Sequence, residues 1–172
     1  MFAEIGKGIL TMKKFFIVIL SALLCLSLVS CSKKYVSDVE TTVISEALQL
    51  GIATDGGYTS PSDKFMTLNI GIPDYYIEEF EIITANDTAN QNQIGIFKAT
   101  STKNAKKVAN YCESYLNNRI ANFDHDIDPD ESDKINNAQV NVFGLYVIYT
   151  ILSPEDTEYA LIIIENLILD KP

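Results

Sequence analysis

The sequence predicts an α+β domain: a small antiparallel sheet of about four strands with helices packed on one face, after a cleaved export signal. Three observations predict it. The order of elements is helix, two strands, helix, two strands, helix. The strands of the second pair are separated by a single glycine turn, and short turns favour antiparallel pairing. The abundance of Ile, Leu, Val, Tyr and Phe, with few Gly and Pro, allows a buried core.

The first 30 residues have the layout of a bacterial export signal. Met12 is followed by Lys13 and Lys14, and then by an apolar stretch from Phe15 to Val29. This stretch of about 15 residues is shorter than the roughly 20 helical residues that span a bilayer. Residues 1–11 add nothing to such a signal, so Met12 is an alternative start of the protein.

The end of this signal resembles the lipobox of bacterial lipoproteins, with Leu28, Val29 and Ser30 before Cys31. The resemblance implies that a diacylglycerol is joined to the Cys31 thiol and that a peptidase cuts after Ser30. Two acyl chains give stable anchoring, at about 0.8 kcal/mol per buried CH₂. We therefore expect a signal peptide at 1–30, a lipidated tether at 31–36 and a single domain at 37–172. The protein would sit on the extracytoplasmic face of a cell membrane, inner or outer.

The net charge of −10 limits the partners. Removing residues 1–30 takes away three lysines and Glu4, which leaves 10 basic and 22 acidic residues. Such a chain lacks the basic face that a nucleic acid needs, so we expect no nucleic-acid partner. Lys33 and Lys34, next to the lipid, either contact lipid head groups or solubilise a short linker.

The first half of the domain opens with a helix. Ser37 to Glu40 has the pattern of a capping box, and Gly51 is a typical helix stop. Residues 52–60 are expected to form a loop and residues 62–68 a short helical turn. Residues 78–84 and 93–100 read as strands. In the second of these, Ile94 and Ile96 lie on one face and Phe97 and Ala99 on the other.

The second half opens with the clearest helix, at 101–123. Its apolar stripe is interrupted by Arg119, the only arginine of the chain, and comprises Ala105, Val108, Cys112, Tyr115, Leu116, Ile120 and Phe123. Residues 139–143 and 145–152 are predicted to form a strand pair that turns near Gly144. Ser153 and Pro154 then open the last helix, which continues to about Leu169.

These elements together resemble the bacterial lipoprotein domain of unknown function numbered 4358 (DUF4358). The matching features are the lipobox, a capped first helix, the Gly71–Asp74 turn, the Gln93–Lys98 strand, the long helix, the Gly144–Ile148 strand and a closing helix. The resemblance covers most of residues 37–169. It implies the fold, but no activity, cofactor or catalytic residue comes with it.

An acidic run has the alternating aspartates of a calcium-binding loop: Asp124, Asp126, Asp128, Asp130, Glu131 and Asp133. An EF-hand needs Gly at its sixth position and Glu at its twelfth, where Pro129 and Ile135 stand. We therefore favour a solvated turn over a metal site, although calcium binding stays open.

Cys112 and His125 are the residue types of a catalytic Cys–His dyad, which needs a thiol next to an imidazole in an accessible cleft. Cys112 is expected to be a core thiol and His125 a surface residue, so we expect no dyad, no cofactor and no enzyme. The chain also lacks the Gly-x-Ser-x-Gly, phosphate-loop and His-Glu-x-x-His motifs.

Two features remain as binding surfaces. Tyr75, Tyr76, Tyr146, Tyr149 and Tyr159 offer rings to a ligand, or pack at a sheet edge. The last helix is apolar around more than one face, so it either lies between the sheet and the first helix or also meets an envelope protein or a second copy. The hypothesis is a membrane-anchored interaction module, and the alternative is a lipoprotein that captures a small ligand or cell-wall fragment.

Overall fold

A five-stranded antiparallel sheet forms the centre of the computed structural model, which describes residues 33–61, 64–126 and 128–170. From Lys34 onward the chain forms one compact unit. The strand order is β1 (Tyr58–Thr59), β2 (Ile77–Ala85), β3 (Gln93–Ala99), β5 (Tyr146–Ile151) and β4 (Gln139–Phe143). The predicted α+β class with an antiparallel sheet is confirmed. The fifth strand, β1, has two residues and lies in the segment that we expected to be loop.

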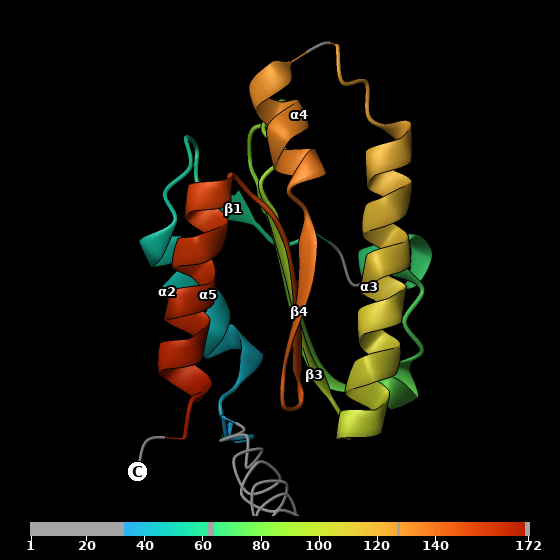
Figure 1. Cartoon of the computed structure of the whole chain (residues 1–172), viewed down its shortest axis with the longest axis vertical. Helices are drawn as coiled ribbons and strands as arrows, with labels where there is room; N and C mark the ends of the chain where they lie inside the picture. Colours follow the sequence, from blue (N-terminus) through green and yellow to red (C-terminus); the bar gives the residue numbers. More distant parts are fainter. Residues whose placement is uncertain (1–32, 62–63, 127, 171–172) are drawn as a thin grey trace, which may run out of the picture. The chain divides into compact units, whose positions relative to one another are not determined.

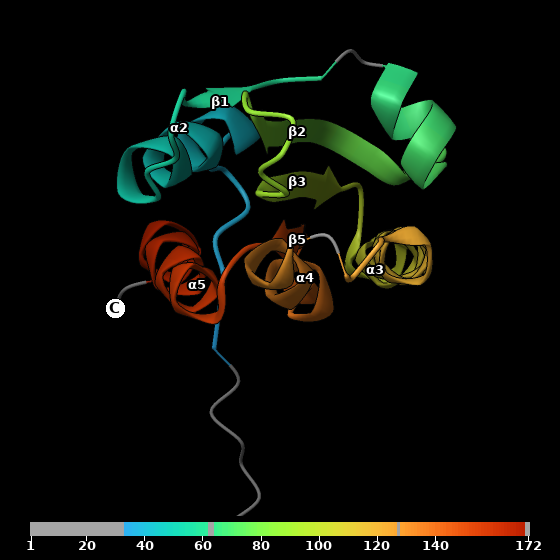
Figure 2. The same cartoon turned by 90° about the horizontal axis from the view of Figure 1, so that it is seen from above.

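Helices cover both faces of this sheet (Figures 1 and 2). α2 (Thr41–Gly51) and α5 (Pro154–Ile168) lie against one face, and α3 (Thr102–Asn122) lies against the other, followed by α4 (Pro129–Asn136). The prediction that the helices share one face is wrong on this point. The reason is visible in β3 and β5, where every residue is buried, so both faces of the central strands need a cover.

The side-chain alternation of the central strands defines two cores. Ile94 and Ile96 belong to the core under α2 and α5, whereas Phe97 and Ala99 belong to the core under α3, as predicted. A π-helical turn, η1 (Met66–Ile70), and a 3₁₀ turn, η2 (Asp74–Tyr76), pack beside α3. The turn η1 falls at the end of the segment where a short helical turn was expected.

The first helix begins three residues later than predicted, with Glu40 instead of Ser37 at the N-cap, and the Ser37–Glu40 capping box does not form. The preceding chain is held extended instead, because Val36 N–H donates to the Ile168 carbonyl at 2.8 Å. The helix starts at Thr41, whose N–H donates to Glu79 Oε2 at 3.1 Å. A carboxylate from strand β2 therefore caps α2 across the fold.

The other helices begin as their sequences indicate. Ser101 and Ser153 accept side-chain hydrogen bonds from Asn104 N–H and Asp156 N–H at the starts of α3 and α5. The acidic run is not a solvated turn throughout, because Asp128 and Pro129 open the helix α4 there. Asp128 Oδ1 accepts from Asp130 N–H at 3.0 Å and from Glu131 N–H at 3.2 Å, which is an ordinary N-cap.

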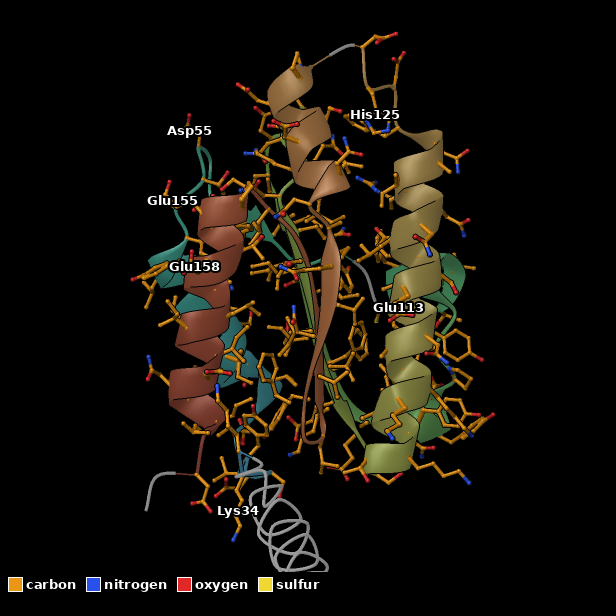
Figure 3. The ribbon with its side chains drawn as sticks, in the orientation of Figure 1. Lys34, Asp55, Glu113, His125, Glu155 and Glu158 are labelled. Atoms are coloured by element: carbon orange, nitrogen blue, oxygen red, sulfur yellow. The ribbon has the colours of Figure 1, made fainter. Side chains whose placement is uncertain are left out.

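Both ends of the domain meet at one end of the sheet. Tyr35 forms an isolated antiparallel bridge with Leu169, and Asp170 N–H donates to the Lys34 carbonyl at 2.9 Å. The Tyr35 ring packs edge-on against Phe143 and lies beside Gly144, whose positive φ of 62° closes the β4–β5 turn. In Figure 3, Lys34 marks this end, and Asp55 and His125 mark the opposite one.

Candidate functional site

A groove of about 370 Å³ lies near the end of the domain that is opposite Lys34. It is built from the C-terminal turns of α3, the turn η1 and the loop between β2 and β3. Its lining residues are mainly amides and aromatic rings: Asn69, Gln91, Tyr115, Asn118, Arg119, Asn122 and Phe123. This composition suits a small polar ligand, and the volume lies within the range of ligand sites.

The cation of this groove is Arg119. One of its guanidinium nitrogens, Nη2, donates to Gln91 Oε1 at 2.5 Å. Arg119 takes no part in the ion pairs that Lys98 and Lys134 form with glutamates in the described ranges. The lining contains no Asp or Glu. The groove thus carries an uncompensated positive charge in a chain with a net charge of −10.

The wall that carries Gln91 is fixed by α4. Gln91 N–H donates to Glu131 Oε2 at 2.7 Å, and the other oxygen of that carboxylate pairs with Lys134 Nζ at 2.6 Å. The same ammonium lies 3.3 Å from Asn90 Oδ1. The helix that interrupts the acidic run therefore positions the loop and, through Gln91, the Arg119 guanidinium.

The floor is aromatic. The Tyr115 hydroxyl donates to Gln93 Oε1 at 2.6 Å, and the Phe65 ring meets the Tyr115 ring edge-on at 6.1 Å. Burial raises the pKa of Tyr115, so this hydroxyl stays neutral at ordinary pH. Arg119 is the residue of this site that the sequence interpretation missed. The one available signal was a cation within an apolar helical stripe.

The acidic run supports structure. Asp128 caps α4, Glu131 holds the loop, and Asp124 Oδ1 accepts from Asp126 N–H at 3.2 Å. A second hollow of about 540 Å³ nearby is lined mostly by polar side chains, among them Asp55, Asp87 and Asp128. In the residues that the structure describes, no group of three His, Cys, Asp or Glu side chains has the arrangement of a metal site.

Cys112 and His125 are not brought together. Cys112 is a fully buried thiol inside α3, and burial raises its pKa far above the ordinary value. Ten residues of helix, about 15 Å, separate it from the end of α3 at Asn122. His125 lies beyond that end on an exposed segment, where its Nδ1 is 2.6 Å from Ser132 Oγ.

The five tyrosines do not converge. Tyr146 and Tyr149 are fully buried on opposite faces of the sheet. Tyr75 and Tyr76 stack edge-on against each other beside α3, where Lys107 Nζ lies 4.5 Å from the centre of the Tyr76 ring. Tyr159 is half-exposed on α5. They therefore form no common pocket in the described part of the domain.

A second surface runs over α2 and α5. We call it the apolar ridge, and its exposed side chains are Val43, Leu50, Tyr159 and Ile162. The two helices approach closely at Gly51, since a Cβ there would lie 3.3 Å from the Tyr159 ring and 2.5 Å from Ile163 Cδ1. The close approach at Gly51 joins α2 and α5 directly below the exposed Tyr159 ring, so the two helices present their exposed apolar side chains as one packed pair.

A model of the domain of unknown function DUF4358 matches residues 55–152, more than half of the chain. The chain belongs to the DUF4358 family. The resemblance drawn from the sequence is confirmed for these residues, which contain the sheet, α3, α4 and the Arg119 groove. The helices α2 and α5 of this DUF4358 protein lie outside the matched residues 55–152. Searches of curated proteins and of solved structures found no match.

The predicted lipid-attachment site falls outside the described residues of the DUF4358 protein. This applies to Cys31 and to the recognition residues Leu28, Val29 and Ser30. Among the helices that the structure describes, none has both the length and the apolar content needed to cross a membrane.

Proposed function

We propose that this DUF4358 protein is an extracytoplasmic lipoprotein, held to the cell membrane by lipid on Cys31, and that it acts by binding rather than by catalysis. The lipobox Leu28–Cys31 supports the anchor. The paired segment of the domain starts at Lys34, three residues after Cys31, so the tether to the lipid would reach at most about 10 Å. Lys33 and Lys34 then lie near the lipid head groups.

This attachment would orient the domain. Tyr35 and the β4–β5 turn lie at the end next to Lys34, and α3 begins near the same end because Ala99 N–H donates to the Leu145 carbonyl at 2.9 Å. Arg119 lies 17 residues along α3, about 25 Å farther from the attachment point. The groove would therefore face away from the bilayer, and the apolar ridge would stand along the side of the domain.

The apolar ridge is the observation that carries the binding role. Leu50 is 89% exposed, Ile162 50% and Tyr159 49%, which is a large exposed apolar content for two helices that pack against each other. Neither α2 nor α5 contains a Lys or Arg, and Figure 3 shows Glu155 and Glu158 on the outer side of α5. An apolar surface with an acidic rim suits an envelope protein that presents apolar side chains flanked by basic ones.

A second candidate is a lipoprotein that captures a small ligand or wall fragment. The Arg119 groove favours this candidate, because its charge is uncompensated and its position is remote from the attachment point. The two candidates use different faces of the domain and are tested separately.

The anchor is tested by replacing one sulfur atom. The variant Cys31→Ser should leave the membrane fraction and migrate differently on a gel, since neither lipidation nor cleavage follows without the thiol. Unchanged partitioning and unchanged migration would overturn the lipoprotein proposal.

The ridge is tested by site-specific photo-crosslinking in intact cells. A crosslinking side chain at Leu50 should give one discrete adduct, whereas the same group at Leu68 on η1, which is 78% exposed, should give none. Ile162→Asp should abolish the adduct at Leu50, since a carboxylate would be placed in the apolar contact. Light scattering on the purified protein gives its mass in solution. A dimer would identify the partner as a second copy, and a monomer would identify it as another protein. Equal adducts at both positions would count against the ridge.

A further inference from the structure

The groove beside α3 differs from the rest of the surface in its charge. The chain carries 23 acidic and 13 basic residues, yet the seven lining residues include one cation and no acid. The cation is an arginine, which binds planar carboxylates through two parallel hydrogen bonds. With Nη2 bound to Gln91, the rest of its guanidinium has no hydrogen bond in the described part of the chain.

The remaining polar groups are suited to amides. Asn69, Gln91, Asn118 and Asn122 each carry one acceptor and two donors on the terminal amide. Part of this capacity is used within the protein. Asn69 Nδ2 donates to the Phe65 carbonyl and Asn122 Nδ2 to the Asn118 carbonyl, while Gln91 accepts from Arg119 and donates through Nε2 to the Ala89 carbonyl. The unused acceptors and donors match the backbone of a peptide, and the rings of Tyr115 and Phe123 give apolar surface for small side chains.

We propose that the Arg119 groove binds a short peptide through its free α-carboxylate, with Arg119 holding the carboxylate and the surrounding amides holding the peptide groups. A single cation favours a singly charged carboxylate over a phosphate, which draws several cations or backbone donors. The inference deepens the ligand-capture candidate. It does not depend on the lipid or on the apolar ridge, so it can fail while both of those stand.

The test uses the full-length chain in detergent and an NMR titration with N-acetyl-dialanine. Binding on the order of millimolar is expected for a ligand of this size. The same peptide with an amidated C-terminus should bind at least about tenfold more weakly, because the charge-assisted pair with Arg119 is lost. No shift with the acid, or equal shifts with acid and amide, would overturn the proposal.

Two variants and one control complete the experiment. Arg119→Gln should weaken the acid at least about tenfold and leave the amide unchanged. Asn118→Asp, an exposed position in the lining, should weaken binding of the acid more than binding of the amide, because it adds a negative charge without touching the core. Lys106→Gln removes one positive charge from the exposed side of the same helix and should leave binding unchanged. Equal losses of affinity in Lys106→Gln and Arg119→Gln would show that only the net charge of the protein matters, and would refute the site.

Discussion

Glu79 Oε1 lies 2.9 Å from Lys98 Nζ, while Oε2 of the same carboxylate accepts from Thr41 N–H at 3.1 Å. One side chain of β2 thus neutralises a largely buried ammonium of β3 and caps the helix α2. Lys98 sits on the same face as Ile94 and Ile96, where an unpaired ammonium would be costly. The pair therefore joins the strands β2 and β3 to the first helix.

The variant Glu79→Gln is expected to lower the free energy of unfolding by about 1–2 kcal/mol at pH 7, because Lys98 loses its nearest partner and the cap loses its charge. Glu78→Gln is the matched control. Glu78 Oε2 lies 3.8 Å from the same ammonium and is more exposed, so the control should lose less. Urea denaturation measures both, and equal losses would contradict the role assigned to Glu79.

The same pair predicts a pH dependence. The hydrogen bond from Lys98, and then that from Thr41 N–H, lowers the pKa of Glu79 below its usual value. A carboxyl with a lowered folded-state pKa stabilises the fold above its unfolded pKa, near 4.3, and this contribution is lost as the pH falls through the folded value. The difference between wild type and Glu79→Gln should therefore shrink below about pH 4. A constant difference from pH 7 to pH 3 would refute this explanation.

Gly95 should not tolerate a side chain. A Cβ at this position would lie 2.1 Å from Cε1 of Tyr149, its cross-strand neighbour, whose ring is fully buried. We expect Gly95→Ala to cost about 3 kcal/mol of stability. In a Tyr149→Leu background the same change should cost clearly less, because the obstructing ring is gone. Thermal unfolding of the four proteins of this cycle gives the coupling, and additive losses would exclude the contact.

Removing the Tyr149 hydroxyl, unlike adding a side chain at Gly95, should not destabilise the protein. Its oxygen is buried with no hydrogen-bond partner in the described residues, and burial raises its pKa well above the usual value. Tyr149→Phe removes this unsatisfied group and keeps the ring, so the stability should stay equal or rise by up to about 1 kcal/mol. Tyr115→Phe, which breaks the hydrogen bond to Gln93, should instead destabilise. A clear loss in Tyr149→Phe would point to a bound water or ligand at this hydroxyl.

Cys112 is expected to be chemically inert in the folded protein. It is fully buried, and its raised pKa leaves almost no thiolate at pH 8. A maleimide should modify it only after unfolding in urea. A variant with an added cysteine, Leu50→Cys, should react rapidly at that exposed position under the same conditions. Rapid native modification of Cys112 would show an opening of α3 that the packing does not predict.

The sequence by itself determined the features that rest on local chemistry. Ser101 and Ser153 cap their helices, Gly144 turns between two strands, and the alternation in Gln93–Ala99 assigns each side chain to its face. Each depends on a few neighbouring residues, so spacing and residue type are sufficient. The DUF4358 resemblance rested on the order of these same elements.

The tertiary structure decided what depends on residues far apart in the chain. The start of α2 is set by Glu79, 38 residues away from Thr41. The covering of both sheet faces follows from the central place of β3 and β5, which no local pattern reports. In the sequence, Arg119 only interrupts an apolar stripe. In the fold, its guanidinium contacts Gln91, which lies 28 residues earlier in the chain. Neighbouring residues therefore determine the helices, strands and turns. Contacts between residues far apart in the chain decide which charged side chains lack an ion-pair partner and where a ligand can bind.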